Sequence, residues 1–114
     1  MNTKTHDMNL HPAPFEAIRS RSKTVEMRLN DEKRQHINIG DLIRFTNVES
    51  GEELLVRVVD RRVYKSFDEL YKFYDKVSIG YMPDEDAHPD DMLLYYAKER
   101  IEKYGALALV IEVV

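Results

Sequence analysis

The 114-residue chain contains no cysteine and no tryptophan. Without cysteine it has no disulfide, no thiol nucleophile and no thiolate metal site, so a reducing compartment is the natural setting. No stretch approaches the roughly 20 apolar residues of a membrane-spanning helix, and the N-terminal segment lacks the apolar core of a signal peptide. We therefore expect a cytoplasmic protein.

The chain also lacks an excess of positive charge, because 17 Lys and Arg stand against 21 Asp and Glu and give a formal net charge of −4. A protein that coats nucleic acid without selectivity needs to neutralise many phosphates, which this balance disfavours. The charge is unevenly spread: residues 1–65 carry 12 Lys and Arg against 10 Asp and Glu, whereas residues 66–114 carry 5 against 11. The acidic second half favours a small or short ligand over a long nucleic-acid track.

The length corresponds to a single domain, residues 1–114, and the 43% of hydrophobic residues suffices for one core. Period-two alternation and turn residues predict strands at 8–10, 23–29, 42–48, 54–64 and 106–114. Helical spacing and capping residues predict helices at 15–20, 67–75 and 89–105. The fourth strand has apolar side chains on both faces and is expected to bend or bulge. The last strand is apolar at nearly every position, which is typical of a central, doubly covered strand. The predicted fold class is α+β, with a curled sheet or β-barrel of about five to six strands and two to three inserted helices.

The second predicted strand carries the sequence Lys23-Thr24-Val25-Glu26-Met27-Arg28. Strand alternation places Thr24, Glu26 and Arg28 on one face. Arginine offers a planar fork of donors for phosphate or carboxylate, lysine a mobile point charge, and glutamate an acceptor that can read an amino group or take a proton. A polar, partly anionic ligand fits this set, although Glu26 and Arg28 could instead simply neutralise each other.

This stretch resembles the G-x-K-x-x-E-x-R signature of the ASCH domain, a small barrel family related to the PUA domains that bind RNA. It matches at Lys23, Glu26 and Arg28, whereas Arg21 stands at the glycine position. The Gly-Asp at 40–41 before a hairpin and the Tyr-Gly at 104–105 before the last strand follow the family order as well. The resemblance implies a PUA-like barrel in which the signature lines a cleft between the helices and the barrel.

The resemblance favours a binding module over an enzyme. Its ligand would be RNA, a nucleotide or a modified nucleoside, and we expect neither a cofactor nor a metal. The expected ligand-binding residues are Lys23, Thr24, Glu26, Arg28, Arg21 and Tyr96. Tyrosine stacks on bases, and Tyr64, Tyr81 and Tyr96 lie nearest to predicted loops or helix edges. The other four tyrosines are expected to pack the helices on the barrel.

Two other classes of function stay open. Some small family members hydrolyse the acetyl amide of acetylated cytidine, with a threonine three positions after the signature lysine, where this chain has Glu26. Other relatives have been assigned ribonuclease activity. In either enzyme the catalytic residues would be Lys23 and Glu26. A protein-interaction or regulatory domain, in which the signature only braces the fold, is the third class.

The acidic loop at 84–88 resembles a metal site only superficially. A calcium loop needs glycine at its sixth and glutamate at its twelfth position, and Pro89 and Tyr95 stand there. The four histidines show no ligand spacing. We expect a solvated loop that is able to supply one acid to the cleft.

Overall fold

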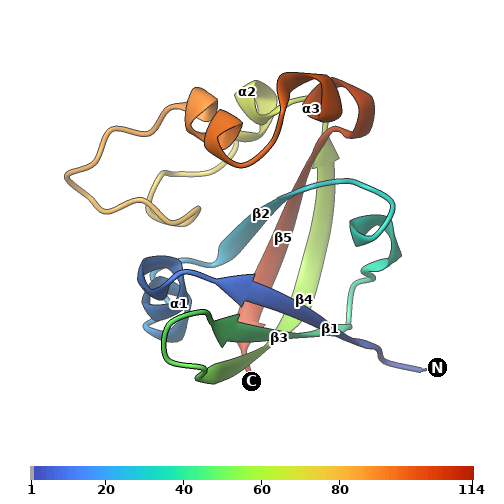
Figure 1. Cartoon of the computed structure of the whole chain (residues 1–114), viewed down its shortest axis with the longest axis vertical. Coiled ribbons are helices and arrows are strands. Elements are labelled where there is room, and N and C mark those ends of the chain that lie inside the picture. The colour runs from blue at the N-terminus through green and yellow to red at the C-terminus, as the bar shows by residue number, and fades with distance from the viewer. Residues whose placement is uncertain (1) are drawn as a thin grey trace.

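Five strands form one curled sheet in the order β1-β3-β4-β5-β2, shown in Figure 1 for the computed structural model, which describes residues 2–114. The strands are β1 (Thr5–Leu10), β2 (Val25–Leu29), β3 (Leu42–Asn47), β4 (Glu53–Tyr64) and β5 (Ala106–Val113). The α-helices are α1 (Pro12–Arg19), α2 (Phe67–Leu70) and α3 (Lys98–Tyr104), and the 3₁₀-helices are η1 (Arg34–His36) and η2 (Pro89–Leu94). Only β1 and β3 pair in parallel. The predicted α+β curled sheet is confirmed.

Strand β5 lies between β4 and β2 and is antiparallel to both. Alternate side chains enter two different cores: Leu107 and Leu109 pack on one face of the sheet, Ala106 and Ala108 on the other, and all four are fully buried. The prediction of a central strand covered on both faces is therefore confirmed. The register of β4 against β5 shifts between Val58 and Asp60, so the expected irregularity in the long strand is also present.

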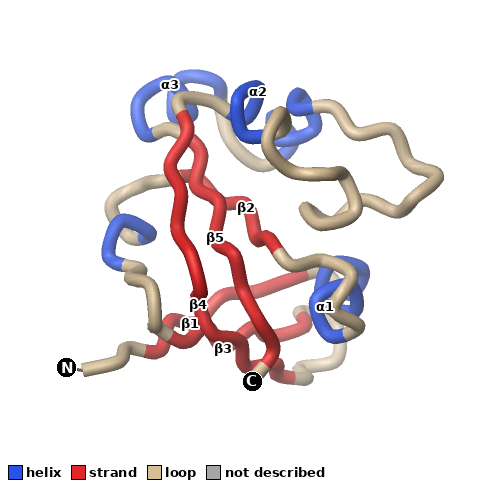
Figure 2. Tube along the Cα trace, turned by 180° about the vertical axis from the view of Figure 1, so that it is seen from behind, coloured by secondary structure: helices blue, strands red, loops and turns tan. Residues whose placement is uncertain are grey.

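The two cores divide the molecule into two layers. The first core fills the concave side of the sheet, where α1 contributes Phe15 and Ile18. The second core lies between the β2–β5 pair and a cap, which we define as residues 65–105, the long insertion between β4 and β5. In Figures 1 and 2 the helices of the cap lie over the ends of β4 and β5 that are far from the C-terminus.

The helices of the cap are shorter than predicted. Ser66 begins α2 as expected, because its Oγ accepts a hydrogen bond from the backbone N–H of Glu69 (3.2 Å), but α2 ends at Leu70 instead of continuing to residue 75. Beyond Leu70 the aromatic side chains pack in pairs: Phe73 stacks on Tyr64 at 5.3 Å, and Tyr74 forms an edge-to-face pair with Tyr64 at 6.1 Å. Aromatic residues are weak helix formers, so tertiary packing decides the path of this segment.

The prediction of one helix over residues 89–105 is wrong. The 3₁₀-helix η2 ends at Leu94, α3 begins at Lys98, and Ala97 between them has an extended backbone. Met92 and Ile101 are both buried in the second core. At 3.6 residues per turn, a continuous helix would put these two residues about two and a half turns apart and therefore on opposite faces. The break turns both side chains toward the same core.

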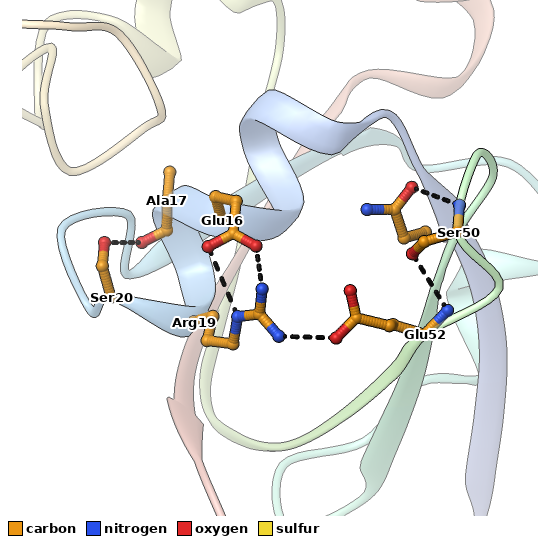
Figure 3. Close-up of polar contacts among 7 residues, drawn as sticks. Glu16, Ala17, Arg19, Ser20, Ser50 and Glu52 are labelled. Carbon is orange, nitrogen blue, oxygen red and sulfur yellow. Dashed lines mark hydrogen bonds and ion pairs between the residues drawn. The ribbon is translucent and has the colours of Figure 1, made fainter.

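The end of α1 is fastened to the turn between β3 and β4, as Figure 3 shows. Arg19 pairs with Glu16 one turn earlier and donates from NH1 to Glu52 at 2.8 Å. All three side chains are substantially exposed, so this contact fixes the orientation of the helix more than it adds stability.

The Gly-Asp turn before β3 acts as a backbone anchor. The Asp41 carboxylate is buried and accepts hydrogen bonds from the backbone N–H of Lys4 (3.3 Å), the backbone N–H of Asn38 (3.0 Å) and Nε2 of His6 (2.8 Å). Burial raises the pKa of Asp41, but these hydrogen bonds outweigh it and hold the pKa below its ordinary value. The Asp41 carboxylate thus ties the start of β1 to the start of the β3–β4 hairpin.

Gly105 connects α3 to β5 with φ +80° and ψ 176°, a conformation open almost only to glycine. A Cβ atom here would lie 2.7 Å from the carbonyl oxygen of Tyr64. We expect Gly105→Ala to lower the free energy of unfolding by roughly 2–4 kcal/mol, measured by urea denaturation. Gly51→Ala is the control, because Gly51 also has positive φ (+76°) but no atom within 4 Å of the position that a Cβ would take. It should cost about 1 kcal/mol, and equal losses in the two variants would contradict the steric argument.

Candidate functional site

A cavity of about 600 Å³ lies between the sheet and the cap. Its walls come from β2, from the junction of β1 and α1, from the loop at 77–88 and from η2. We call the side formed by β2 the sheet wall and the side formed by the cap the cap wall. The two walls differ in chemistry, so each is described separately.

The sheet wall is built around one buried carboxylate. Oε1 of Glu26 lies 2.7 Å from Nζ of Lys23, and Oε2 lies 2.7 Å from NH2 and 2.8 Å from Nε of Arg28. Glu26 is 2% exposed and Lys23 is 8% exposed. We call these three residues the signature network. The network carries one more positive than negative charge.

Burial penalises the charged form of Glu26 and on its own would raise the pKa of this carboxyl. The neighbouring charges and hydrogen bonds of Lys23 and Arg28 outweigh that penalty, so the pKa of Glu26 lies below its ordinary value. Burial likewise lowers the pKa of Arg28, but Glu26 and then Tyr96 more than compensate for it. At neutral pH Glu26 is therefore an ionised carboxylate with both oxygens engaged, which makes it a poor general base.

Arg28 also holds the two edge strands of the sheet together. Its NH2 donates to Glu26 on β2 and to the backbone carbonyl of Asn9 on β1 at 3.0 Å. Because β1 and β2 stand at opposite ends of the strand order, this guanidinium bridges the two edges where the curled sheet approaches closure. The pairing of Glu26 with Arg28, which the sequence left as an alternative to ligand binding, is present, and both residues also line the cavity.

The cap wall carries a chain of hydroxyl groups that ends at a carboxylate. The Tyr81 hydroxyl donates to Oδ2 of Asp91 at 2.6 Å and lies 2.8 Å from the Tyr71 hydroxyl. Desolvation, followed by the bonds to Asp91 and Tyr71, raises the pKa of Tyr81. All three side chains line the cavity, together with Glu85 from the acidic loop.

The walls meet at Gly80, which precedes Tyr81. A Cβ atom on Gly80 would come within 3.1 Å of Cδ of Lys23, and the residue has φ +114°. The backbone of the loop therefore rests directly on the alkyl chain of the signature lysine. The same loop is joined to the start of β2, because the carbonyl of Ser78 accepts from the backbone N–H groups of Thr24 (2.9 Å) and Val25 (3.0 Å).

Residues 8–114 match the sequence model of the ASCH domain family. The chain belongs to the ASCH domain family. Its fold is similar to the crystal structure of hypothetical protein PH0355, with 34% identity, a TM-score of 0.84, and coverage of 96% of this chain and 99% of that one. The solution structure of protein PF0455 from Pyrococcus furiosus is 35% identical, with a TM-score of 0.72 and coverage of 96% and 97%. The ASCH protein from Zymomonas mobilis shares the fold at 14% identity, with a TM-score of 0.69 and coverage of 98% of this chain and 71% of that one. No curated protein matches the sequence.

Of the residues predicted for the site of this ASCH domain, the structure brings Lys23, Glu26, Arg28 and Tyr96 together in the cavity. It does not bring Arg21 and Thr24 there. These two residues, with Lys23, line a separate depression of about 250 Å³ between α1 and the end of β5. Thr24 precedes Val25, the first residue of β2, and is exposed, so it does not line the cavity with Glu26 as expected.

Arg21 occupies the family's glycine position and has a left-handed conformation, with φ +71°. Its backbone N–H is bound to the carbonyl of Ile18 (3.0 Å), and the N–H of Lys23 is bound to the carbonyl of Ala17 (3.0 Å). The tight reversal after α1 thus requires positive φ at this position, which glycine adopts without strain and arginine does not. The departure from the motif therefore adds strain to this turn.

The tyrosines divide differently from the prediction. Tyr81 and Tyr96 line the cavity as expected, but Tyr64 does not, because it stacks on Phe73 at a ring distance of 5.3 Å and its hydroxyl lies 3.0 Å from that of Tyr74. Tyr71 and Tyr95, which were expected to pack the helices, also line the cavity. The sequence contained no signal for them or for Asp91, since their position depends on how the cap folds over the sheet. Glu85 fulfils the expectation that the acidic loop supplies an acid.

Among residues 2–114, no group of three or more His, Cys, Asp or Glu side chains is placed to hold a metal ion. Within the same residues, no helix is both long enough and apolar enough to cross a membrane.

The signature network predicts an ordered set of stability losses. Glu26→Gln should lower the free energy of unfolding by about 3–5 kcal/mol, because two buried cations lose their shared counter-charge. Lys23→Met and Arg28→Met should each cost roughly 1–3 kcal/mol, because one cation remains beside Glu26. The double variant with Glu26→Gln and Arg28→Met should recover part of the loss of Glu26→Gln. Urea denaturation measures all four, and costs that simply add would show that the three side chains do not act together.

The lowered pKa of Glu26 also predicts acid sensitivity. The folded protein releases this proton more readily than the unfolded chain, whose ordinary value is 4.5, so the contribution of the carboxylate is complete above that pH and is lost as the pH falls below it. The stability difference between the wild type and Glu26→Gln should therefore be constant from pH 7 to about 5 and should shrink below about 4.5. Asp41 is present in both proteins, so its own pH-dependent contribution to stability cancels when the two free energies of unfolding are subtracted. A gap that persisted unchanged at about pH 3 would contradict a folded pKa below the ordinary value.

Proposed function

We propose that this ASCH domain binds RNA, a nucleotide or a modified nucleoside by taking one nucleoside unit into the cavity between the sheet and the cap. The observation that carries the proposal is the combination, in one cavity of about 600 Å³, of a buried cationic network with four tyrosines. Cavities for small ligands usually measure roughly 300–1,000 Å³ and combine apolar surface with a few fixed polar groups. A nucleoside has the matching features, namely an aromatic base, ring polar atoms and an oxygen-rich sugar or phosphate.

The sheet wall supports binding of an oxygen-rich or anionic group. Lys23 gives one N–H to Glu26, and its other two ammonium protons have no partner among residues 2–114. Its alkyl chain is held by Gly80, so the ammonium is positioned before a ligand arrives. A pre-positioned, largely desolvated cation binds an acceptor more strongly than a mobile surface lysine does.

The cap wall supports binding of a base. Tyr71, Tyr81, Tyr95 and Tyr96 come from the segment after α2, from the loop and from the end of η2. Base–tyrosine stacking tolerates different bases and does not require a basic groove. That property suits this part of the chain, because residues 84–91 contain five acids and no Lys or Arg.

Binding is favoured over hydrolysis by the state of Glu26. It stands where acetylcytidine-hydrolysing relatives have threonine, and both of its oxygens are engaged by Lys23 and Arg28. Thr24, the nearest threonine in sequence, is exposed and lies outside the cavity. The acidic surroundings of the cap wall favour a single nucleoside unit or a short strand over a long one.

The proposal is tested by comparing two aromatic side chains of equal exposure. Tyr95 (65% exposed) lines the cavity, whereas Phe73 (66% exposed) does not. Wild-type protein is titrated with nucleoside 5′-monophosphates and with a mixed-sequence hexaribonucleotide, and binding is followed through the backbone amide resonances of residues 79–81. We expect Tyr95→Ala to weaken binding by about fivefold or more, since stacking contributes about 1–3 kcal/mol per base, and Phe73→Ala to leave it unchanged.

The result that would overturn the proposal is the absence of any shift at residues 79–81 with all of these ligands at millimolar concentration. Equal weakening by Tyr95→Ala and Phe73→Ala would also count against it, because the site would then lie elsewhere on the surface.

A further inference from the structure

The hydrogen-bond direction of the cap wall is fixed by its geometry. The Tyr81 hydroxyl has one proton and lies 2.6 Å from Oδ2 of Asp91 but 3.4 Å from the carbonyl of His88, so it donates to Asp91. In its contact with Tyr71 it therefore accepts, and Tyr71 donates. Both hydroxyl protons therefore point along the chain toward Asp91. What this wall still offers to a ligand is acceptors: lone pairs of the Tyr71 oxygen and Oδ1 of Asp91, which has no partner among residues 2–114.

A third acceptor lies close by on the acidic loop. Oε1 of Glu85 accepts from the backbone N–H of Met82 at 2.7 Å, which fixes the orientation of the carboxylate. Oε2 of Glu85 has no partner among residues 2–114, and the residue lines the cavity. The cap wall is thus an acceptor surface with a negative charge.

The sheet wall has the opposite polarity. Both oxygens of Glu26 are used by Lys23 and Arg28, so the network presents N–H donors and no free acceptor. Lys23 is 8% exposed and lines the cavity, so its ammonium group is largely withdrawn from water. The cavity therefore has a donor side and an acceptor side, which meet at Gly80.

We propose that the unit recognised in this cavity is guanine, with its N1–H and N2 amino group facing Asp91 and Tyr71 and with O6 and N7 facing Lys23 and Arg28. The inference rests on the proposed function and deepens it by naming the base. Guanine is the base with contiguous ring N–H and amino donors on one side and two adjacent acceptors next to them. Contacts from arginine or lysine to O6 and N7 are the commonest specific contacts made to guanine by proteins.

The other bases match less of this arrangement. Adenine has no oxo group for the donor side, and uracil has no amino group for the acceptor side. Cytosine has one amino group and no ring N–H, so it satisfies fewer of the acceptors on the cap wall. A buried acceptor or donor left without its partner lowers affinity strongly, and this is the general basis of discrimination between similar ligands.

The experiment compares guanosine 5′-monophosphate with inosine 5′-monophosphate, which differ only in the N2 amino group. Dissociation constants are measured by amide-resonance titration for the wild type, for Asp91→Asn and for Asp90→Asn. Asp90 is the neighbouring exposed acid, so its variant matches the charge change outside the cavity. We expect the wild type and Asp90→Asn to prefer the guanosine nucleotide by about tenfold or more, and Asp91→Asn to lose most of that preference. Tyr71→Phe keeps the hydrogen bond between Tyr81 and Asp91 and should reduce the preference for the guanosine nucleotide by a smaller factor. This variant tests the cap wall independently if Asp91→Asn fails to fold.

The outcomes separate the two proposals. If nucleotides bind but guanosine 5′-monophosphate is not preferred over the inosine, adenosine, cytidine and uridine nucleotides, the assignment of guanine is overturned and the nucleoside site stands. A preference that survives intact in both Asp91→Asn and Tyr71→Phe likewise overturns it. If no nucleotide binds, both proposals are overturned.

Discussion

The structure depends on a carboxylate placed where water does not reach it. Glu26 is stable there only because Lys23 and Arg28 approach its two oxygens from different directions. Lys23 belongs to the segment leaving α1, and Arg28 extends across to the carbonyl of Asn9 on β1. The network therefore joins α1, β2 and β1 at the open edge of the sheet, where backbone hydrogen bonds do not run from one edge strand to the other. Because Gly80 packs on Lys23, the position of the cap depends on the same ion pair.

The strands could be predicted because their side-chain pattern is local: alternation and turn residues indicated the first four, and the nearly uniform apolar sequence of β5 indicated both the strand and its central position. The cap could not be predicted to the same degree. Its helices end where aromatic packing and the joint burial of Met92 and Ile101 override the helical pattern, and such long-range contacts leave no period in the sequence. The residues of the cavity divide in the same way into those that could be predicted from the sequence and those that could not. Lys23, Glu26 and Arg28 were recognisable from their resemblance to the family signature, whereas Asp91 and Tyr71 are joined through Tyr81 only because the cap folds back over β2.

The two walls of the cavity have separate structural origins, and this separation suits a recognition site. The sheet wall belongs to the barrel, where changing a residue disturbs folding. The cap wall consists of a 3₁₀-helix and loops, held by side-chain hydrogen bonds such as the one between Tyr81 and Asp91. The donors thus lie on and beside a strand of the sheet and the acceptors on a 3₁₀-helix and loops, and loops generally tolerate more sequence change than the scaffold that carries them.

The shared carboxylate has a consequence for how such a domain can diverge. Loss of Glu26 leaves two buried cations without their counter-charge, and loss of Lys23 or Arg28 removes one of the two partners of the buried carboxylate. A lineage passing through single substitutions therefore meets a stability cost at each of the three positions. Selection for folding alone is then enough to preserve the trio. Two homologous domains could both retain Lys23, Glu26 and Arg28 and still bind different molecules. The shared signature would then indicate common ancestry and not a common ligand. The residues that distinguish their ligands would have to be sought in the insertion between β4 and β5.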